Sequence, residues 1–151
     1  MLLVKPVTDN QIIINSSPEK IFDFVTVPDN WVGTHPVTKA VKGETGISAG
    51  VGKRWTEVIE GGGITFDAEW EVIACARPSL WTISSPNFNS MPIRVIITYT
   101  FNEVEGGTLF RREMSIEFED DPDLYPTAEL FKKSSEGHDQ YLLKAKQCLE
   151  D

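Results

Sequence analysis

A stripe of residues at helical spacing occupies the C-terminal quarter of the chain. The stripe repeats at i, i+4, i+7, i+11, i+14 and i+18, and its members are Phe131, Ser135, His138, Leu142, Ala145 and Leu149. This spacing predicts one long helix over residues 124–149, with the stripe on a single face. The face is apolar toward its C-terminal end but small or polar in the middle. We therefore expect the space beneath the helix to be incompletely filled, as in a cavity that binds a small molecule.

Most of the chain before this helix has the pattern of β-strands. In residues 64–76, Phe66, Ala68 and Trp70 alternate with acidic residues, which is typical of a half-buried antiparallel strand. Glycine-containing turns at 61–63 and 105–107 favour hairpins between neighbouring strands. The expected strands are residues 11–15, 37–42, 53–60, 64–76, 80–85, 93–103 and 108–119.

Two short helices are expected directly after the first strand. Ser17 is a suitable N-terminal cap, Pro18 suits the first helical position, and Glu19 lies in the first turn. After a break at residues 28–30, a second helical turn carries Trp31. A sheet of about seven strands must twist and curl, so the sequence predicts an α+β fold in which a curved antiparallel sheet wraps around the C-terminal helix. Residues 1–151 should form one domain.

Four segments, taken in order, resemble the START-like (SRPBCC) superfamily in its polyketide cyclase/dehydrase-like branch. The segments are IIINSSPEKIFDFV, NWVGTHP, GITFDAEWEVIACARPSLWTI and GGTLFRREMSIEF. The resemblance implies a helix-grip fold with a deep cavity between sheet and long helix. It also implies a hydrophobic ligand such as a lipid, polyketide or aromatic compound. Carriers, cyclases, hormone receptors and chaperone regulators share this fold, so the fold alone does not decide the activity.

The ligand site is expected between the sheet and the long helix, in an enclosed pocket of at least several hundred Å³. Phe66 is a further candidate for its wall. The expected ligand-binding residues are Trp70, Tyr99, Phe110, Arg112, Met114, Phe131, Ser135, His138 and Leu142. Arg112 and His138 are the polar anchors of this set.

Each polar candidate has two interpretations. A buried Arg112 needs a partner, which is either a ligand carboxylate or enolate oxygen or an internal acid such as Glu57. His138 either bonds a ligand and moves protons, or is a packed histidine bonded to a neighbour. His35 lies either at the mouth of the cavity or in a capped turn.

Three functions are compatible with this pattern. The first is binding or carriage of an apolar small molecule. The second is a cyclase or dehydratase acting on a polyketide-like substrate, in which His138 moves a proton and Arg112 stabilises an oxyanion. The third is a protein-interaction or chaperone-regulating module. The sequence leaves open whether the chain is an enzyme and which residues would be catalytic.

Charge and composition limit the classes of molecule that the chain is expected to bind. The net charge of −9, from 23 acidic and 14 basic residues, disfavours nucleic acid. No segment suggests a secretory signal or the roughly 20 apolar residues of a membrane span, so a cytoplasmic protein is expected. Cys75 and Cys148 are expected as free thiols. Two histidines give too few ligands for a metal site, no cofactor is expected, and the chain should be a monomer or a homodimer.

Overall fold

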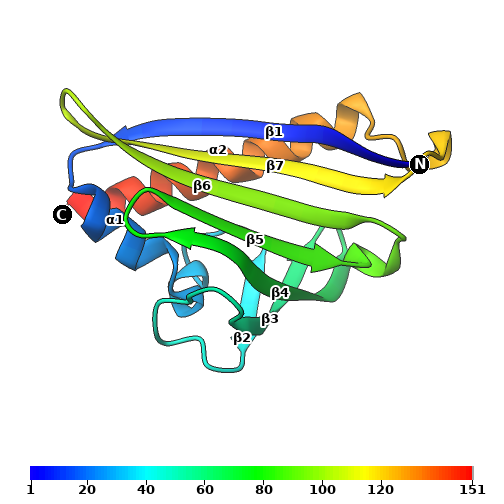
Figure 1. The fold of residues 1–151 in the computed structure, drawn as a ribbon, viewed down its shortest axis with the longest axis horizontal. Coiled ribbons are helices and arrows are strands. Elements are labelled where there is room, and N and C mark those ends of the chain that lie inside the picture. The colour runs from blue at the N-terminus through cyan, green and yellow to red at the C-terminus, as the bar shows by residue number, and fades with distance from the viewer. Residues whose placement is uncertain (151) are drawn as a thin grey trace.

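A computed structural model describes residues 1–150 and shows an α+β fold (Figure 1). The long elements are the strands β1–β7 and the helices α1 and α2, and three single turns of 3-10 helix lie between them. In chain order the elements are β1 (Leu2–Ile14), α1 (Pro18–Val25), η1 (Pro28–Trp31), β2 (Thr38–Lys42), β3 (Arg54–Gly61), β4 (Ile64–Ala76), β5 (Leu80–Pro86), η2 (Phe88–Ser90), β6 (Arg94–Val104), β7 (Gly107–Glu119), η3 (Pro122–Leu124) and α2 (Ala128–Glu150).

The seven strands form one antiparallel sheet in the order β1-β7-β6-β5-β4-β3-β2. The chain therefore runs from one edge strand to the other through α1 and η1, and then returns strand by strand. Gly107 begins β7 with a φ of 136°, and a Cβ at this position would lie 2.1 Å from the carbonyl oxygen of Ile14. Only glycine allows this approach, and it fixes the start of β7 against the end of β1.

Two boundaries differ from the sequence-based prediction. The first strand begins at Leu2 instead of residue 11, and it pairs with β7 along its whole length. Pro6 and a shift in register between Pro6 and Thr8 interrupt the alternation that would have revealed it. The last helix begins at Ala128 instead of about residue 124. Pro126 disfavours helical geometry just before it, and Thr127 caps the helix by accepting a hydrogen bond from the Leu130 amide.

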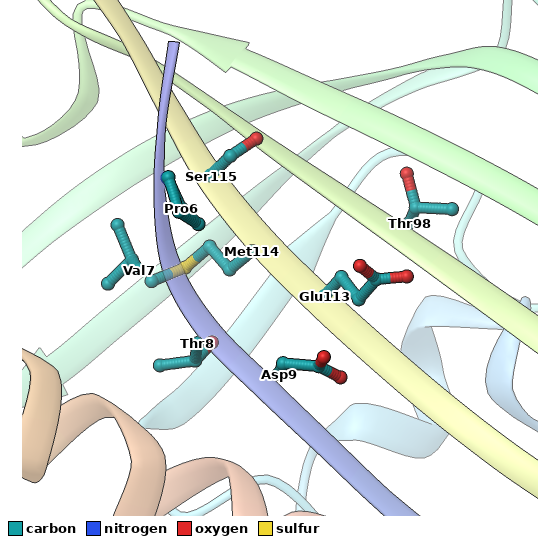
Figure 2. A pocket seen from close by; sticks show the side chains of 8 residues that line it. All are labelled: Pro6, Val7, Thr8, Asp9, Thr98, Glu113, Met114 and Ser115. Carbon is teal, nitrogen blue, oxygen red and sulfur yellow. The ribbon is translucent and has the colours of Figure 1, made fainter.

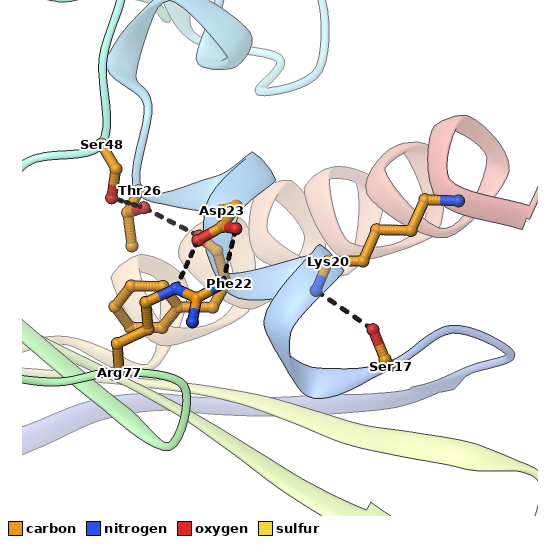
Figure 3. Close-up of polar contacts among 7 residues, drawn as sticks. All are labelled: Ser17, Lys20, Phe22, Asp23, Thr26, Ser48 and Arg77. Atoms are coloured by element: carbon orange, nitrogen blue, oxygen red, sulfur yellow. Dashed lines mark hydrogen bonds and ion pairs between the residues drawn. The ribbon is translucent and has the colours of Figure 1, made fainter.

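Helix α1 is held at one end of the sheet by its caps and by one ion pair (Figure 3). Ser17 accepts a hydrogen bond from the Lys20 amide at 3.2 Å, as the sequence predicted for the N-terminal cap. Arg77, in the turn before β5, donates two hydrogen bonds of 2.8 Å to Asp23. The buried face of α1, which includes Phe22, therefore closes this end of the interior.

Helix α2 lies along the sheet and packs mainly against β1 (Figure 1). Its buried residues His138, Leu142, Ala145 and Leu149 belong to the predicted stripe, which confirms the orientation of the helix. Asn10 on β1 adds a polar link, because its Nδ2 donates to Asp139 Oδ1 at 2.7 Å. None of the helices within residues 1–150 has the length and apolar character needed to cross a bilayer.

Candidate functional site

A buried arginine lies in the interior between the sheet and α2. Arg112 on β7 is only 4% exposed, and its Nε donates to the hydroxyl oxygen of Tyr99, the residue opposite it on β6, at 3.0 Å. The guanidinium carbon lies 5.3 Å from the Tyr99 ring centroid and 5.4 Å from that of Tyr141 on α2. Residues from the sheet and the helix therefore enclose one positive charge, with two aromatic faces against it.

Two buried donors at this charge have no hydrogen-bond partner within the described residues, Arg112 Nη1 and the Tyr141 hydroxyl. Trp55 Nε1 and the Ser85 hydroxyl also have none. Burial raises the pKa of Tyr141 well above its ordinary value, so this phenol keeps its proton. A buried donor without a partner typically costs about 1–3 kcal/mol, and such atoms are rare in native interiors. A buried water or an oxygen atom of a bound molecule can satisfy donors of this kind.

Glu57 is a second buried ionisable group, on β3. Its Oε1 accepts a hydrogen bond from Trp70 Nε1 at 2.9 Å, and its Oε2 accepts one from the Thr38 hydroxyl. Burial raises the pKa of Glu57, although these two hydrogen bonds and the positive charge of Arg112 act in the opposite direction. Glu57 therefore lies near enough to feel the charge of Arg112, yet the two groups have separate partners.

This arrangement bears on the two interpretations of Arg112. The internal salt bridge to Glu57 is not formed in the described part of the chain, since Arg112 donates to Tyr99 and Glu57 accepts from Trp70 and Thr38. Arg112 has an internal partner in the Tyr99 hydroxyl instead, and its role as a ligand anchor stays a prediction.

The two histidines lie together beside Tyr141. His138 Nδ1 shares a 2.8 Å hydrogen bond with the Thr8 hydroxyl, and the His35 ring centroid lies 6.0 Å from that of His138 and 5.0 Å from that of Tyr141. Burial lowers the pKa of both imidazoles, and the charge of Arg112 lowers it further. Both rings are therefore neutral at neutral pH, which suits hydrogen bonding better than proton transfer.

A surface hollow of about 410 Å³ lies beside the group formed by His35, His138 and Tyr141, and His35 lines it. Its lining residues are Gly33, Thr34, His35, Pro36, Thr38, Gln140 and Lys144. Two of them continue into the interior, because His35 packs on Tyr141 and Thr38 donates to Glu57. We call this hollow the mouth. His35 lines this hollow, and its Nδ1 also accepts a hydrogen bond from the Val37 amide at 3.4 Å. The second contact fits the capped turn that was the other sequence-based interpretation of His35.

A second hollow, of about 440 Å³, lies where the β1–β7 pairing changes register (Figure 2). Figure 2 shows Asp9 and Glu113 projecting on one side of the strand pair. Both carboxylates already form ion pairs with Arg111. The unpaired donors described above line neither this hollow nor the mouth. Thr8, which lines this hollow, bonds His138, and the predicted ligand-binding residue Met114 also lines it.

The predicted ligand-binding residues are mostly buried, but they pack on one another instead of lining an empty cavity. Tyr99 and Phe110 stack at 6.0 Å between ring centroids, and Leu142 is also fully buried. Trp70, Arg112 and His138 are buried as well, while Met114, Phe131 and Ser135 are half-buried. Side chains without exposed area cannot border a void of several hundred Å³. Within residues 1–150 these side chains therefore border no enclosed pocket of that size, and the prediction of one is wrong.

Ser135 has a different environment from the other predicted residues. Its hydroxyl accepts a hydrogen bond from Asn10 Nδ2 at 3.1 Å, so it ties α2 to β1. Sequence reasoning missed Tyr141, which lies against Arg112. Tyr141 directly precedes Leu142 and could have been assigned to a wider stripe.

Comparison with known proteins agrees with the fold and with the resemblance in the sequence. Residues 6–137 match the family described as polyketide cyclase / dehydrase and lipid transport. The penitrem biosynthesis cluster 1 protein I of Penicillium ochrochloron is 36% identical over 109 residues, which cover 69% of this chain and 71% of that protein.

Solved structures show the same fold at low sequence identity. The di-domain ARO/CYC BexL of the BE-7585A biosynthetic pathway has a TM-score of 0.73 at 14% identity, and the match covers 99% of this chain and 50% of BexL. Ara h 8.0201 has a TM-score of 0.70 at 11% identity, covering 99% and 98%. Protein MLL2253 of Mesorhizobium loti has a TM-score of 0.67 at 18% identity, covering 99% and 96%.

Proposed function

Because the chain belongs to the polyketide cyclase / dehydrase and lipid transport family, we propose that it binds a small and mostly apolar molecule between the sheet and α2. The ligand carries at least one oxygen that accepts hydrogen bonds. The names of two similar proteins support this class of ligand, since both place those proteins in the biosynthesis of small molecules.

The unpaired Nη1 of Arg112 is the observation that carries the proposal. A guanidinium group has five N–H donors and cannot lose its proton in a protein, so a buried one needs acceptor atoms. A carbonyl or carboxylate oxygen at this position would accept from Arg112 and could also reach the Tyr141 hydroxyl. The surrounding rings of Tyr99 and Tyr141 would contact the apolar part of the ligand.

Entry of a ligand requires the interior to open. Helix α2 packs mainly against a single edge strand, β1, and residues of both α2 and the segment 33–38 line the mouth. A shift of α2 away from His35 would widen the mouth and expose Arg112. Such opening is a population shift in which the ligand selects the open state.

A matched pair of probes tests the proposal. Naphthalene and 2-acetylnaphthalene differ by one carbonyl group, and quenching of the buried Trp31–Trp55–Trp81 cluster reports binding. We expect the wild type to prefer the ketone about 10-fold or more, since a hydrogen bond to a charged group is worth roughly 1.5–3 kcal/mol. Arg112→Met should remove this preference. Native mass spectrometry of the purified protein would also show any co-purified ligand.

Arg111→Met is the control, because the neighbouring Arg111 is paired with Asp9 at the surface. This variant should keep the preference for the ketone. The proposal is contradicted if the wild type binds neither probe, or if Arg112→Met prefers the ketone as strongly as the wild type does.

A further inference from the structure

Building on the proposed function, we infer that the mouth is a second binding site, which holds an anionic group of the ligand. Lys144 and His35 are the residues that bind this group. The corresponding ligand class is organic acids with an apolar body, in which a carboxylate stays in the mouth while the rest of the molecule enters the interior.

The first argument is the charge of the side chains that line the mouth. Lys144 is the one charged residue among them, and no aspartate or glutamate lines this hollow, although acidic residues outnumber basic ones by 23 to 14 in the chain. Lys133, on the same helix, pairs with Glu129 four residues before it. Lys144 has Gln140 at the corresponding position and forms no ion pair within residues 1–150. Its ammonium group is therefore available to an anion.

The second argument is a free donor on His35. The Val37 amide donates to Nδ1 of this imidazole, and burial keeps the ring neutral by lowering its pKa. When Nδ1 of a neutral imidazole accepts a hydrogen bond, the proton is on Nε2, which is then a donor. Nε2 has no hydrogen-bond partner in the described part of the chain. His35 is only 9% exposed and lines the mouth, so a nearly buried side chain offers an unpaired N–H group there.

The third argument is the positive charge on the interior side of the mouth. The His35 and Tyr141 rings lie 5.0 Å apart between centroids, and the guanidinium carbon of Arg112 lies 5.4 Å from the Tyr141 centroid. The charge of Arg112 lowers the pKa of His35, so its potential reaches the lining of the mouth. An anion in the mouth is therefore attracted from two sides, by Lys144 at the surface and by Arg112 in the interior.

Glu57 opposes this attraction only weakly. It is the acid that is hydrogen-bonded to a residue of the lining, because it accepts from the Thr38 hydroxyl. Its other oxygen accepts from Trp70, and burial raises the pKa of Glu57, which favours the uncharged form. The carboxylate of Glu57 is therefore engaged on the interior side of Thr38 and leaves the mouth to a carboxylate of the ligand.

The shape of the ligand follows from the position of the two sites. His35 and Arg112 both contact the ring of Tyr141, so the mouth and the buried guanidinium lie about one side chain apart. A ligand whose carbonyl group and carboxylate lie at opposite ends of two fused rings can reach both. The single positive charge of Lys144 matches the single negative charge of a carboxylate.

A matched pair of probes tests the inference. 6-Acetyl-2-naphthoate is 2-acetylnaphthalene with a carboxylate at the far end of the rings, and quenching of the buried tryptophan cluster gives the dissociation constant of each. We expect the wild type to bind the acid about 10-fold more tightly than the neutral ketone, because hydrogen bonds to charged groups are the stronger class. A higher salt concentration should reduce this advantage, since Lys144 is exposed and its charge is screened.

Substitutions at the mouth assign the advantage to its residues. Lys144→Met removes the charge from an exposed position and should lose most of the advantage of the acid, whereas Lys144→Arg should keep it. His35→Phe keeps a ring against Tyr141, removes the Nε2 donor and should lose part of the advantage. Lys133→Met is the control, because it removes an exposed lysine of the same helix that does not line the mouth. It should bind both probes as the wild type does.

The outcomes separate this inference from the proposed function. If the wild type binds the acid and the neutral ketone equally tightly, the inference is wrong and the binding function stands. The inference is also wrong if Lys144→Met keeps the full advantage while Arg112→Met loses it, because the carboxylate then lies on Arg112. If the wild type binds neither probe, the binding function is contradicted and the inference fails with it.

Discussion

The two ends of the interior differ in whether their buried polar groups all have hydrogen-bond partners. Near α1 the interior is apolar and closely packed: Phe22 and Phe101 meet edge-to-face at 5.3 Å, and Phe101 stacks on Phe110 at 5.2 Å. Around Arg112 the interior holds buried charges, neutral histidines and unpaired donors. The first region has the composition of an ordinary core, whereas the second carries polar groups that folding alone does not need.

Within this one interior, the region near α1 contributes to stability, whereas the region around Arg112 is the candidate for function. Apolar burial contributes about 25 cal/mol for each Å² removed from water, so the region near α1 stabilises the fold. The unpaired donors around Arg112 lower the free energy of unfolding. Apolar burial near α1 offsets this loss. Substitutions in the two regions should therefore change stability in opposite directions.

The largest effect is expected at Phe22, which is 1% exposed in the apolar region. Phe22→Ala removes its contacts with Phe101 and should lower the free energy of unfolding by about 3–5 kcal/mol. Urea denaturation followed by tryptophan fluorescence measures the change. Phe131→Ala, at a half-buried position on α2, is the comparison and should lose less. A loss below about 1 kcal/mol for Phe22→Ala would contradict the division into two regions.

The opposite effect is expected when both buried charges are removed together. The double variant Arg112→Met/Glu57→Gln keeps similar volumes and leaves neither charge without compensation. We expect its free energy of unfolding to be unchanged or to rise by about 1–4 kcal/mol, while the preference for 2-acetylnaphthalene over naphthalene is lost.

The surface pair Arg111–Asp9 provides the control for this double variant. Arg111→Met/Asp9→Asn should change the free energy of unfolding by less than about 1 kcal/mol. If the interior double variant instead loses more than about 2 kcal/mol, the buried charges stabilise the fold and the contrast between the two regions is wrong.

Acidification should destabilise the polar region through its two histidines. The pKa values of His35 and His138 lie below the ordinary 6.5 in the folded chain, so the unfolded state binds more protons once the pH falls below about 6.5. Stability therefore falls as the pH decreases, by up to about 1.4 kcal/mol per pH unit for each histidine. Glu57, whose pKa is raised, acts in the opposite direction above the unfolded value of 4.5.

Unfolding by urea at pH 7.5, 6.5 and 5.5 measures this dependence. His138→Asn places an amide oxygen near the position of Nδ1, which can still bond Thr8, and it should show a shallower decline below pH 6.5 than the wild type does. An identical pH dependence in the variant and the wild type would show that His138 is protonated equally in both states.

The apolar region could be predicted from the sequence because its signals are local. The helical spacing of Leu142, Ala145 and Leu149 determines which face of α2 is buried, and the Ser17 cap determines where α1 begins. The alternation in residues 64–76 likewise assigns Ala68 and Val72 to the inner face. Each of these features depends on residues within a few positions of one another.

The polar region could be predicted only in part. Arg112 was assigned to the inner face by alternation, but its environment depends on the register that places Tyr99 opposite it. The hydrogen bonds to Glu57 come from two other strands, and a shift of one residue in either would remove them. The closed interior was also not predictable, because it depends on how side chains from distant elements fill the same space.

The smallest effect is expected at Gly137, which lies on α2 beside the mouth. A Cβ at this position would meet Pro36 Cγ at 3.9 Å, an ordinary contact. Gly137→Ala should therefore raise the free energy of unfolding by about 0.5–1 kcal/mol through helix propensity alone. The added methyl group also fills space between α2 and residues 33–36, so it should slow ligand entry if the mouth is the route. Stopped-flow fluorescence with 2-acetylnaphthalene measures this rate, and an unchanged association rate would place the route elsewhere.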